Sequence, residues 1–310
     1  MRTAFINTLC ALAKKDNNIF LLNGDLGFSV LEPFIDAYPA RSFNMGVAEA
    51  NMMGVAAGLA LSGKTVFVYS IIPFVTARVF EQVRNDIALQ KANVKIVGVG
   101  SGLTYGQLGP THHSIEDIAL MRALPNMTVI CPGDPLETAE ATKALAMLKG
   151  PAYLRIGKKG EPVVHINTPS FKIGEGILIK KGGEGTLIAT GNMLPTGYAV
   201  VNALAKKGKN MRLFSMHTIK PLDRHIIIKA AQETPAIFTL EEHSVIGGLG
   251  SAVAEVLAEN NQGKKIYFRR LGINDCFTLT AGSHDFLRRF HKLSFNDISN
   301  TIWRDLKKIA

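Results

Sequence analysis

A single carboxylate stands within a long apolar segment near the start of the chain. Glu49 is the only charged residue between Gly46 and Ser62, and most of its neighbours are methionine, valine, leucine, alanine or glycine. This composition predicts a helix buried nearly all round, in which an unpaired charge is costly. One interpretation makes Gly46 the N-cap and Glu49 the capping residue at position N3. The other makes Glu49 a desolvated carboxyl that faces a ligand nitrogen.

Two adjacent histidines form a second candidate group. His112 and His113 follow Gly-Pro-Thr, after a predicted strand at 94–99. Ligands of α/β proteins bind at the carboxyl ends of parallel strands, so this loop can offer imidazoles to a substrate. Alternatively, Thr111 or Ser114 caps the next helix and the histidines only flank it. A metal site is less favoured, because no predicted helix carries histidines at i and i+4.

Glycine-rich turns and a late basic cluster are weaker signals. The loop at 23–29 has backbone N–H groups that could bind phosphate, but it has neither a GK[ST] nor a G-x-G-x-x-G motif. The glycines at 247–250 are interpreted as a strand-to-helix turn. The late basic residues are interpreted as a solvated face, because nucleic-acid binding favours interleaved aromatic platforms. They are Lys264, Lys265, Arg269, Arg270, Arg288, Arg289, Lys292, Arg304, Lys307 and Lys308.

The elements that must position these residues alternate between strand and helix patterns, which predicts parallel sheets covered by helices. An N-terminal helix, with Thr3 as its N-cap, comes first. In the first half, strands are predicted at 19–22, 65–69, 94–99, 127–130 and 152–156, and helices at 47–61, 76–90, 113–121 and 135–148. In the second half, strands are predicted at 186–190, 211–215, 236–240 and 265–269, and helices at 195–206, 222–232 and 249–259.

Length and composition bound the organisation. A chain of 310 residues predicts about two domains, and the stretch at 157–185 is rich in Gly, Lys and Pro. We therefore expect two consecutive three-layer α/β domains, at 1–165 and 181–310, joined by a linker at 166–180. Three cysteines without a CxxC motif exclude a disulfide framework and indicate a reducing compartment, which we take to be the cytoplasm. The net charge of +10 favours anionic partners.

Five motifs, in this order and spacing, resemble the second half of transketolase. Its relatives include 1-deoxyxylulose-5-phosphate synthase and the β subunits of 2-oxoacid dehydrogenases. The resemblance covers essentially the whole chain and implies a pyrimidine-binding domain followed by a transketolase C-terminal domain. The motifs are Gly46-Val47-Ala48-Glu49, Gly109-Pro110-Thr111-His112, Leu124-Pro125-Asn126-Met127, Thr218-Ile219-Lys220-Pro221-Leu222-Asp223, and Glu241-Glu242-His243-Ser244 with Gly247-Gly248-Leu249-Gly250.

The resemblance implies a cofactor, thiamine diphosphate, and residues that bind it. In this family the glutamate that matches Glu49 bonds N1′ of the aminopyrimidine. That bond favours the imino tautomer, so N4′ can act as a base toward the thiazolium C2 proton. Tyr69 and Phe74 are the candidates for the aromatic side chains that sandwich the pyrimidine. Asp25 is a further cofactor-binding candidate.

Substrate contacts are implied in the same way. His112 matches a histidine that faces the reacting sugar and is, with Glu49, a predicted catalytic residue. Three further residues match positions that hold the sugar phosphate in relatives, and a guanidinium can bind phosphate through two hydrogen bonds. These residues are Ser29, Arg78 and Arg155.

Two positions depart from transketolases that use simple sugar phosphates. Leu108 stands where they have an aspartate, and Gly100 stands about where they have a histidine. The usual pentose phosphates lose two polar partners as a result. We therefore expect a changed donor or acceptor, such as a modified or nucleotide-linked sugar.

The diphosphate half of the cofactor site is missing. The Gly-Asp-Leu-Gly sequence at 24–27 belongs to the pyrimidine domain and no matching Asn pair follows it. A separate subunit is therefore expected to hold the diphosphate and a Mg²⁺ or Ca²⁺ ion. The expected assembly is α2β2, with self-dimerisation of this chain and no metal site in it. Neither nucleic-acid nor membrane binding is expected.

The predicted function is that of a transketolase subunit, which transfers a two-carbon ketol unit from a ketose donor, such as a ketose phosphate, to an aldose-type acceptor. One alternative is the E1 β subunit of a 2-oxoacid dehydrogenase, which Arg78 and Arg155 disfavour because they indicate a sugar phosphate. The other is a non-catalytic regulatory subunit, against which the retained Glu49 and His112 argue.

Overall fold

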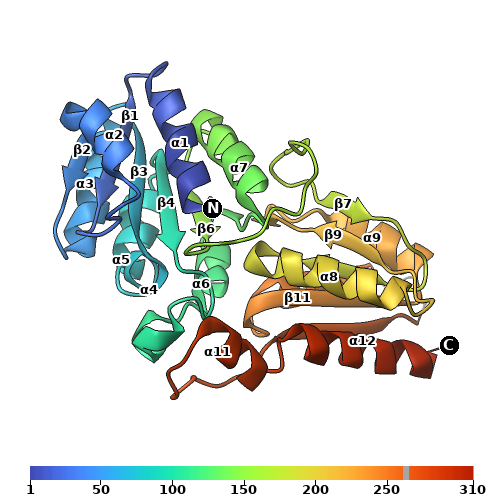
Figure 1. The fold of residues 1–310 in the computed structure, drawn as a ribbon. Coiled ribbons are helices and arrows are strands. Elements are labelled where there is room, and N and C mark those ends of the chain that lie inside the picture. The colour runs from blue at the N-terminus through green and yellow to red at the C-terminus, as the bar shows by residue number, and fades with distance from the viewer. Residues whose placement is uncertain (261–264, 310) are drawn as a thin grey trace.

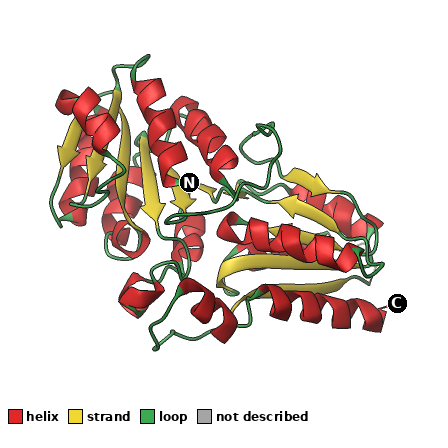
Figure 2. Ribbon diagram, viewed as in Figure 1, coloured by secondary structure: helices red, strands yellow, loops and turns green. Residues whose placement is uncertain are grey.

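Two parallel-type sheets, each covered by helices on both faces, make up the molecule (Figure 1, Figure 2). This computed structural model describes residues 1–260 and 265–309. The expectation of two consecutive α/β domains is confirmed. In both domains the central strands are buried on both faces, which is why they read in the sequence as short runs of β-branched and aliphatic residues.

The first sheet has the strand order β10-β5-β6-β4-β3-β1-β2. Every neighbouring pair is parallel except β10 and β5. The strands are β1 (Ile19–Asn23), β2 (Ser42–Asn44), β3 (Thr65–Ile71), β4 (Val94–Val99), β5 (Thr128–Ile130), β6 (Ala152–Ile156) and β10 (Thr218–Lys220). β10 comes from the second half of the chain, so the first sheet is completed by a strand that the pattern did not predict.

Helices cover both faces of this sheet. One face carries α1 (Arg2–Ala13), α2 (Glu32–Ala37) and α7 (Pro135–Met147), which share a core with the inner strands. The other face carries α3 (Glu49–Leu61), α4 (Ile72–Val75), α5 (Phe80–Gln82), a π-helix (Val83–Ala88) and α6 (Asp117–Ala123). Two short 3-10 helices, η3 (Gly106–Leu108) and η4 (Pro110–His112), lie in the loop after β4.

The second sheet has the order β12-β11-β8-β9-β7, and only the β7–β9 pair in this order is antiparallel. α8 and α12 cover one face, while α9 and α10 cover the other. The strands are β7 (Ile177–Lys180), β8 (Thr186–Ala189), β9 (Arg212–Ser215), β11 (Ala236–Ser244) and β12 (Tyr267–Ile273). The helices are α8 (Leu194–Ala205), α9 (Arg224–Glu233), α10 (Leu249–Glu259), α11 (His284–Phe290) and α12 (Phe295–Ile309).

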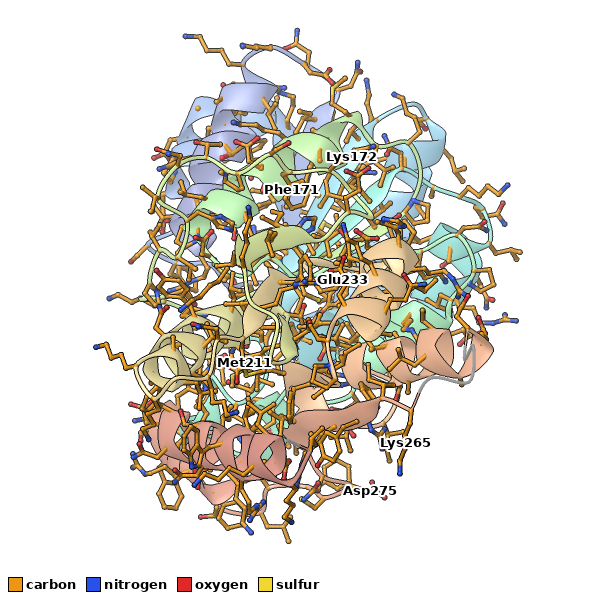
Figure 3. All side chains as sticks on the ribbon, turned by 90° about the vertical axis from the view of Figure 1, so that its right-hand side faces the viewer. Phe171, Lys172, Met211, Glu233, Lys265 and Asp275 are labelled. Atoms are coloured by element: carbon orange, nitrogen blue, oxygen red, sulfur yellow. The ribbon has the colours of Figure 1, made fainter. Side chains whose placement is uncertain are left out.

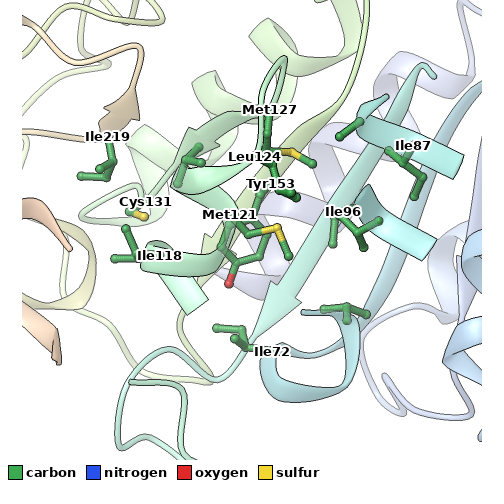
Figure 4. Packing of buried hydrophobic residues seen from close by; sticks show 14 of the residues in the cluster. Ile72, Ile87, Ile96, Ile118, Met121, Leu124, Met127, Cys131, Tyr153 and Ile219 are labelled. Atoms are coloured by element: carbon green, nitrogen blue, oxygen red, sulfur yellow. The ribbon is translucent and has the colours of Figure 1, made fainter. Parts of the chain in front are cut away.

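A continuous apolar core joins the two domains. Ile118 on α6, Cys131 after β5 and Ile219 on β10 lie in one cluster (Figure 4). The same cluster includes residues of α9 and α10. The connecting loop at 157–176 packs onto this junction, where the ring of Phe171 stacks 4.0 Å from that of His217. Figure 3 shows Phe171 and Lys172 on this loop. The domains are therefore held together by burial as well as by the chain connection.

Three local predictions differ from the structure, and some helices were not predicted. α1 begins at Arg2 and has no side-chain cap, so Thr3 is not its N-cap. The helix predicted at 76–90 is divided into α5 and a π-helix. α6 begins at Asp117 without a side-chain cap, so neither Thr111 nor Ser114 caps it. α11 and α12 were not anticipated from the pattern.

α3 is also less buried than its composition indicated. Met52, Met53 and Ala56 face the core, but the opposite side carries exposed Val55 and Leu61. The residues of this exposed side are apolar or small, which explains why the sequence could not distinguish it from a buried face. Among the described residues, none of the helices is both long and apolar enough to cross a membrane.

Candidate active site

Glu49 lies at the start of α3, where the carboxyl ends of β1 and β3 meet. Its N-cap is Ala48 and it is the first residue of the helix, so the interpretation of Gly46 as N-cap with Glu49 at N3 is wrong. The side chain is only 2% exposed. One carboxylate oxygen accepts a hydrogen bond from Ser70 Oγ at 3.3 Å, and the other pairs with Arg78 Nη1 at 2.9 Å. Glu49 therefore stands as a buried carboxylate whose partners are side chains of other elements.

An aromatic ring and an imidazole lie beside this carboxylate. Phe74 is on α4, and the guanidinium carbon of Arg78 lies 3.9 Å from the centre of its ring. The ring of His112, on η4, meets Phe74 edge-on with centroids 5.2 Å apart. Burial, together with the nearby Arg78 charge, lowers the pKa of His112 from its usual value. The imidazole is thus held neutral near pH 7 and can accept or donate a proton.

Four predicted residues thereby come together, although they are distant in sequence. β3 leads directly into α4, and the loop after β4 brings η4 against α4. Helix α3 contacts both β1 and β3. The shared cause is the parallel sheet, whose strand ends all open on the same edge. The four residues, called the Glu49 cluster below, are Glu49, Phe74, Arg78 and His112.

Asp25 and Ser29 lie on the exposed loop after β1. The Asp25 carboxylate accepts a hydrogen bond from Asn44 Nδ2 at 2.8 Å, and its backbone N–H donates to Asn44 Oδ1. The backbone N–H of Ser29 donates to the Glu32 carboxylate at 2.7 Å. Neither side chain has a contact with the Glu49 cluster in the structure. The link between loop and cluster is Gly24, where an added Cβ would lie 3.4 Å from Glu49.

Tyr69 is not available to stack on a ligand. It is fully buried on the opposite face of β3, where its ring stacks on Phe5 of α1 with centroids 6.1 Å apart. Burial also raises the pKa of its phenol well above the usual value. Successive residues of a strand point to opposite faces, so Ser70 faces Glu49 while Tyr69 faces α1. The prediction that Tyr69 sandwiches the pyrimidine is therefore wrong.

Arg155 is not available to bind a substrate phosphate. Its side chain is 1% exposed and pairs with the Asp117 carboxylate at 2.7 Å. It also donates to the backbone carbonyls of Ser114 and Glu242, at 2.8 and 3.1 Å. The prediction for Arg155 is therefore wrong, because its donors hold α6, the loop after β4 and β11 together.

The sequence did not indicate two residues that lie near the Glu49 cluster. Ser70 could have been found from the alternation of β3, which places it on the face opposite Tyr69. Tyr105 is the other, with its ring 6.4 Å from that of His112. Gly100 has φ of +89°, and an added Cβ would lie 2.0 Å from the Tyr105 ring. Tyr105 thus fills the space that a side chain at position 100 would need, and Leu108 nearby is exposed.

The Glu-Glu-His-Ser segment of β11 lies at the domain junction. Glu241 accepts the N–H groups of Leu249 and Gly250 at the start of α10, each at 2.7 Å. Glu242 accepts the N–H of Leu103 at 2.7 Å and also pairs with His284 and Arg288 of α11. Glu241, Glu242 and His243 are fully buried, while Ser244 is half-buried. The segment therefore connects the two domains through buried side chains.

His243 completes the connector. Its Nε2 accepts the N–H of Ile118 at 3.2 Å, which fixes Nδ1 as the protonated nitrogen and as the donor to Ser244 O at 2.8 Å.

Of the late basic cluster, Arg269 pairs with Asp305, while Lys264 lies outside the described residues. No metal-holding group of three or more His, Cys, Asp or Glu side chains was found among the described residues.

Two family models identify the class of protein to which this fold belongs. The first domain matches the family model "Transketolase, pyrimidine binding domain" over residues 1–161. The second matches "Transketolase, C-terminal domain" over residues 174–298. The chain belongs to the transketolase family, as its motifs had indicated, and membership implies dependence on thiamine diphosphate.

Individual relatives within the family are transketolase subunits. The chain is 39% identical to one of the subunits of the apulose-4-phosphate transketolase of Phocaeicola vulgatus, covering 93% of this chain and 92% of the relative. It is 38% identical to the 6-deoxy-6-sulfo-D-fructose transketolase subunit of a Clostridium species, covering 96% and 92%. A solved structure described as a split gene transketolase, inactive beta4 tetramer, superposes with a TM-score of 0.89 at 38% identity, covering 100% of this chain and 98% of that one. The expectation of a transketolase-type subunit is confirmed.

Proposed function

We propose that this chain is the pyrimidine-binding subunit of a split transketolase that moves a two-carbon ketol unit between sugars. The observation that carries the proposal is the Glu49 cluster. A buried carboxylate, an aromatic ring and a neutral imidazole meet at the strand ends of the first domain. This set of groups fits a planar, nitrogen-rich ring that needs one acidic partner and one stacking surface.

Within this proposal each residue has a distinct task. When bound, thiamine diphosphate would supply the electron sink for breaking and forming the carbon–carbon bond. Glu49 would hold a proton at N1′, in surroundings of low polarity that strengthen the hydrogen bond. Phe74 would provide the stacking surface. His112, at the edge of Phe74, would face the reacting sugar and move a proton at its hydroxyl.

The diphosphate and its Mg²⁺ or Ca²⁺ ion would be held by a separate subunit. In support, Asp25 is already paired with Asn44. The relatives named above are called subunits, and the similar solved structure is described as an inactive tetramer of β chains. The exposed apolar side of α3, with Val55 and Leu61, provides a surface for subunit contacts, either with the partner or in a self-dimer. The proposed active assembly is α2β2.

The substrate is proposed to be a sugar with an anionic group and an altered carbon chain. Exposed Leu108 offers no hydrogen bond where an acceptor hydroxyl would otherwise find one. Tyr105 fills the space beside Gly100. Arg78 and Ser29 remain the candidates for the anionic group. The two relatives are named for a sugar phosphate and a sulfonated sugar, which are both anionic.

Reconstitution tests the proposal. The chain would be mixed with a diphosphate-domain subunit carrying Gly-Asp-Gly and Asn-Asn motifs. Thiamine diphosphate binding with Mg²⁺ is then measured by calorimetry, and ketol transfer is measured with a panel of ketoses. We expect binding and transfer only in the mixture. Tight binding and turnover by this chain alone would exclude the separate subunit, while brisk turnover of xylulose 5-phosphate with ribose 5-phosphate would exclude the altered substrate.

A further inference from the structure

The guanidinium of Arg78 makes both contacts that the proposed aminopyrimidine needs. Its Nη1 donates to Glu49 Oε2 at 2.9 Å, and its central carbon lies 3.9 Å from the centre of the Phe74 ring. A guanidinium and an aminopyrimidine are both planar, both carry N–H donors at the edge, and both stack on aromatic faces. The two groups cannot occupy this position at the same time.

Burial of the Glu49 carboxylate explains why the Arg78 guanidinium occupies the position between Glu49 and Phe74. Glu49 is 2% exposed, and a buried carboxylate without a cationic or hydrogen-bonding partner is costly. Ser70 provides only one hydrogen bond, at 3.3 Å, and that bond goes to the other oxygen. Arg78 therefore supplies the charge-assisted contact that keeps the Glu49 side chain in place.

The Arg78 side chain can also move away from Glu49 and Phe74. Its side chain is 45% exposed, and it stands between α4 and α5 with its backbone N–H bonded to Pro73 O. The side chain can turn toward solvent without moving the buried residues Val75 and Val79 on either side of it. Its long, flexible stem lets the guanidinium move while the backbone stays fixed.

We propose that the Arg78 guanidinium occupies the position between Glu49 and Phe74 in place of the aminopyrimidine. The guanidinium stays there until the cofactor binds and displaces it. Displacement frees the guanidinium beside His112, where it binds the anionic group of the sugar. Arg78 thus opposes cofactor binding and favours substrate binding, so that a cation for the substrate becomes available only after the cofactor is bound. This inference rests on the function proposed above.

The test measures two affinities that must change in opposite directions. In the assembled complex, Arg78→Ala is expected to bind thiamine diphosphate about 3–10-fold more tightly, because no partly exposed ion pair and no cation–π contact has to be broken. The KM for an anionic ketose is expected to rise about 10-fold or more. Arg78→Lys keeps the charge but loses the planar group, so its cofactor affinity should fall between the two. Arg84→Ala, an exposed arginine of the adjacent π-helix, is the control and should change neither quantity.

Competition gives a second readout that does not depend on turnover. In Arg78→Ala, added methylguanidinium should fill the vacated position and weaken thiamine diphosphate binding in proportion to its concentration. The wild-type complex should not respond. Equal or weaker cofactor binding by Arg78→Ala would overturn the inference, as would a lack of competition. If the wild-type complex binds no thiamine diphosphate at all, the proposed function itself fails.

Discussion

The loop between β4 and α6 separates two groups of charged side chains with contrasting surroundings. On one side, His112 faces Phe74 and the Glu49–Arg78 pair, and Arg78 is nearly half exposed. On the other side, Leu103 and Ser114 bond the buried side chains of Glu242 and Arg155. Both groups contain carboxylates, arginines and histidines. They differ in how many of their hydrogen bonds are already made within the protein.

This difference indicates that the Glu49 cluster can bind a ligand, whereas the charged side chains at the domain junction hold the structure together. At the domain junction, Arg155, Asp117 and Glu242 have fixed protein partners and almost no exposure. In the Glu49 cluster, by contrast, an exposed arginine and a half-buried imidazole leave room for a ligand. As Arg155 shows, an arginine that matches a phosphate-binding position of relatives does not establish phosphate binding until its exposure and its partners are known. Four variants test the contrast, two for each group.

Glu49→Gln is expected to have the largest effect. In the reconstituted complex it should lower kcat by about 10²–10⁴-fold, the usual contribution of a positioned acid or base. The amide cannot exchange a proton, which lowers kcat. Because the amide keeps the shape of the side chain, thermal stability should change little. Steady-state kinetics and a melting curve measure the two effects. Glu81→Gln on neighbouring α5 is the control, and activity within threefold of wild type in Glu49→Gln would contradict the assignment.

Arg155→Met should act on stability. It leaves the Asp117 carboxylate buried without its cation, so the free energy of unfolding should fall by about 3–5 kcal/mol. Urea denaturation measures this change. Arg224→Met removes the exposed pair with Glu259 and should cost at most about 1 kcal/mol. A stable Arg155→Met protein with a raised KM for an anionic substrate would restore the phosphate-binding role.

His243 predicts a pH dependence at the domain junction. Burial lowers its pKa from 6.5 to about 4, so below pH 6.5 the unfolded chain binds more protons than the folded one. Stability should therefore fall as the pH drops from 6.5 to 4, by roughly 3 kcal/mol from this histidine alone. Glu241, whose pKa burial raises from 4.5 to about 7, acts with the opposite sign between those values.

The two contributions are separated by comparing wild type with His243→Gln. Their difference in unfolding free energy, measured by urea denaturation at several pH values, isolates the histidine. We expect this difference to narrow as the pH falls from 6.5 to 4. A difference that stays constant over that interval would show that His243 does not titrate there.

Phe74→Ala should have the smallest effect. It removes the stacking surface but leaves Glu49 in place, so thiamine diphosphate should bind about 3–10-fold more weakly to the assembled complex. Calorimetry measures the affinity, and Phe74→Tyr, which keeps an aromatic ring, should stay within about twofold of wild type. Unchanged affinity in the alanine variant would remove Phe74 from the cofactor position.

Much of the fold followed from the sequence, because its cause is local. Strands 94–99 and 152–156 were predicted with their observed bounds, since fully buried parallel strands are short runs of mostly apolar residues. β10 could not be foreseen, because it pairs with β5 of the other domain through a contact between residues about ninety positions apart. The segment at 76–90 is divided into α5 and a π-helix, which both contact α3, and the sequence pattern did not predict this division.

By itself, the sequence determined the alternation of strands and helices, the family of the chain, and the importance of Glu49 and His112 as candidates. Only the tertiary structure decided which neighbours those residues have. It turned Tyr69 toward α1, buried Arg155 against Asp117, and placed Arg78 on both Glu49 and Phe74. The physical reason is that periodicity and composition report on local conformation. Which hydrogen bonds a charged group completes depends instead on residues brought close by folding.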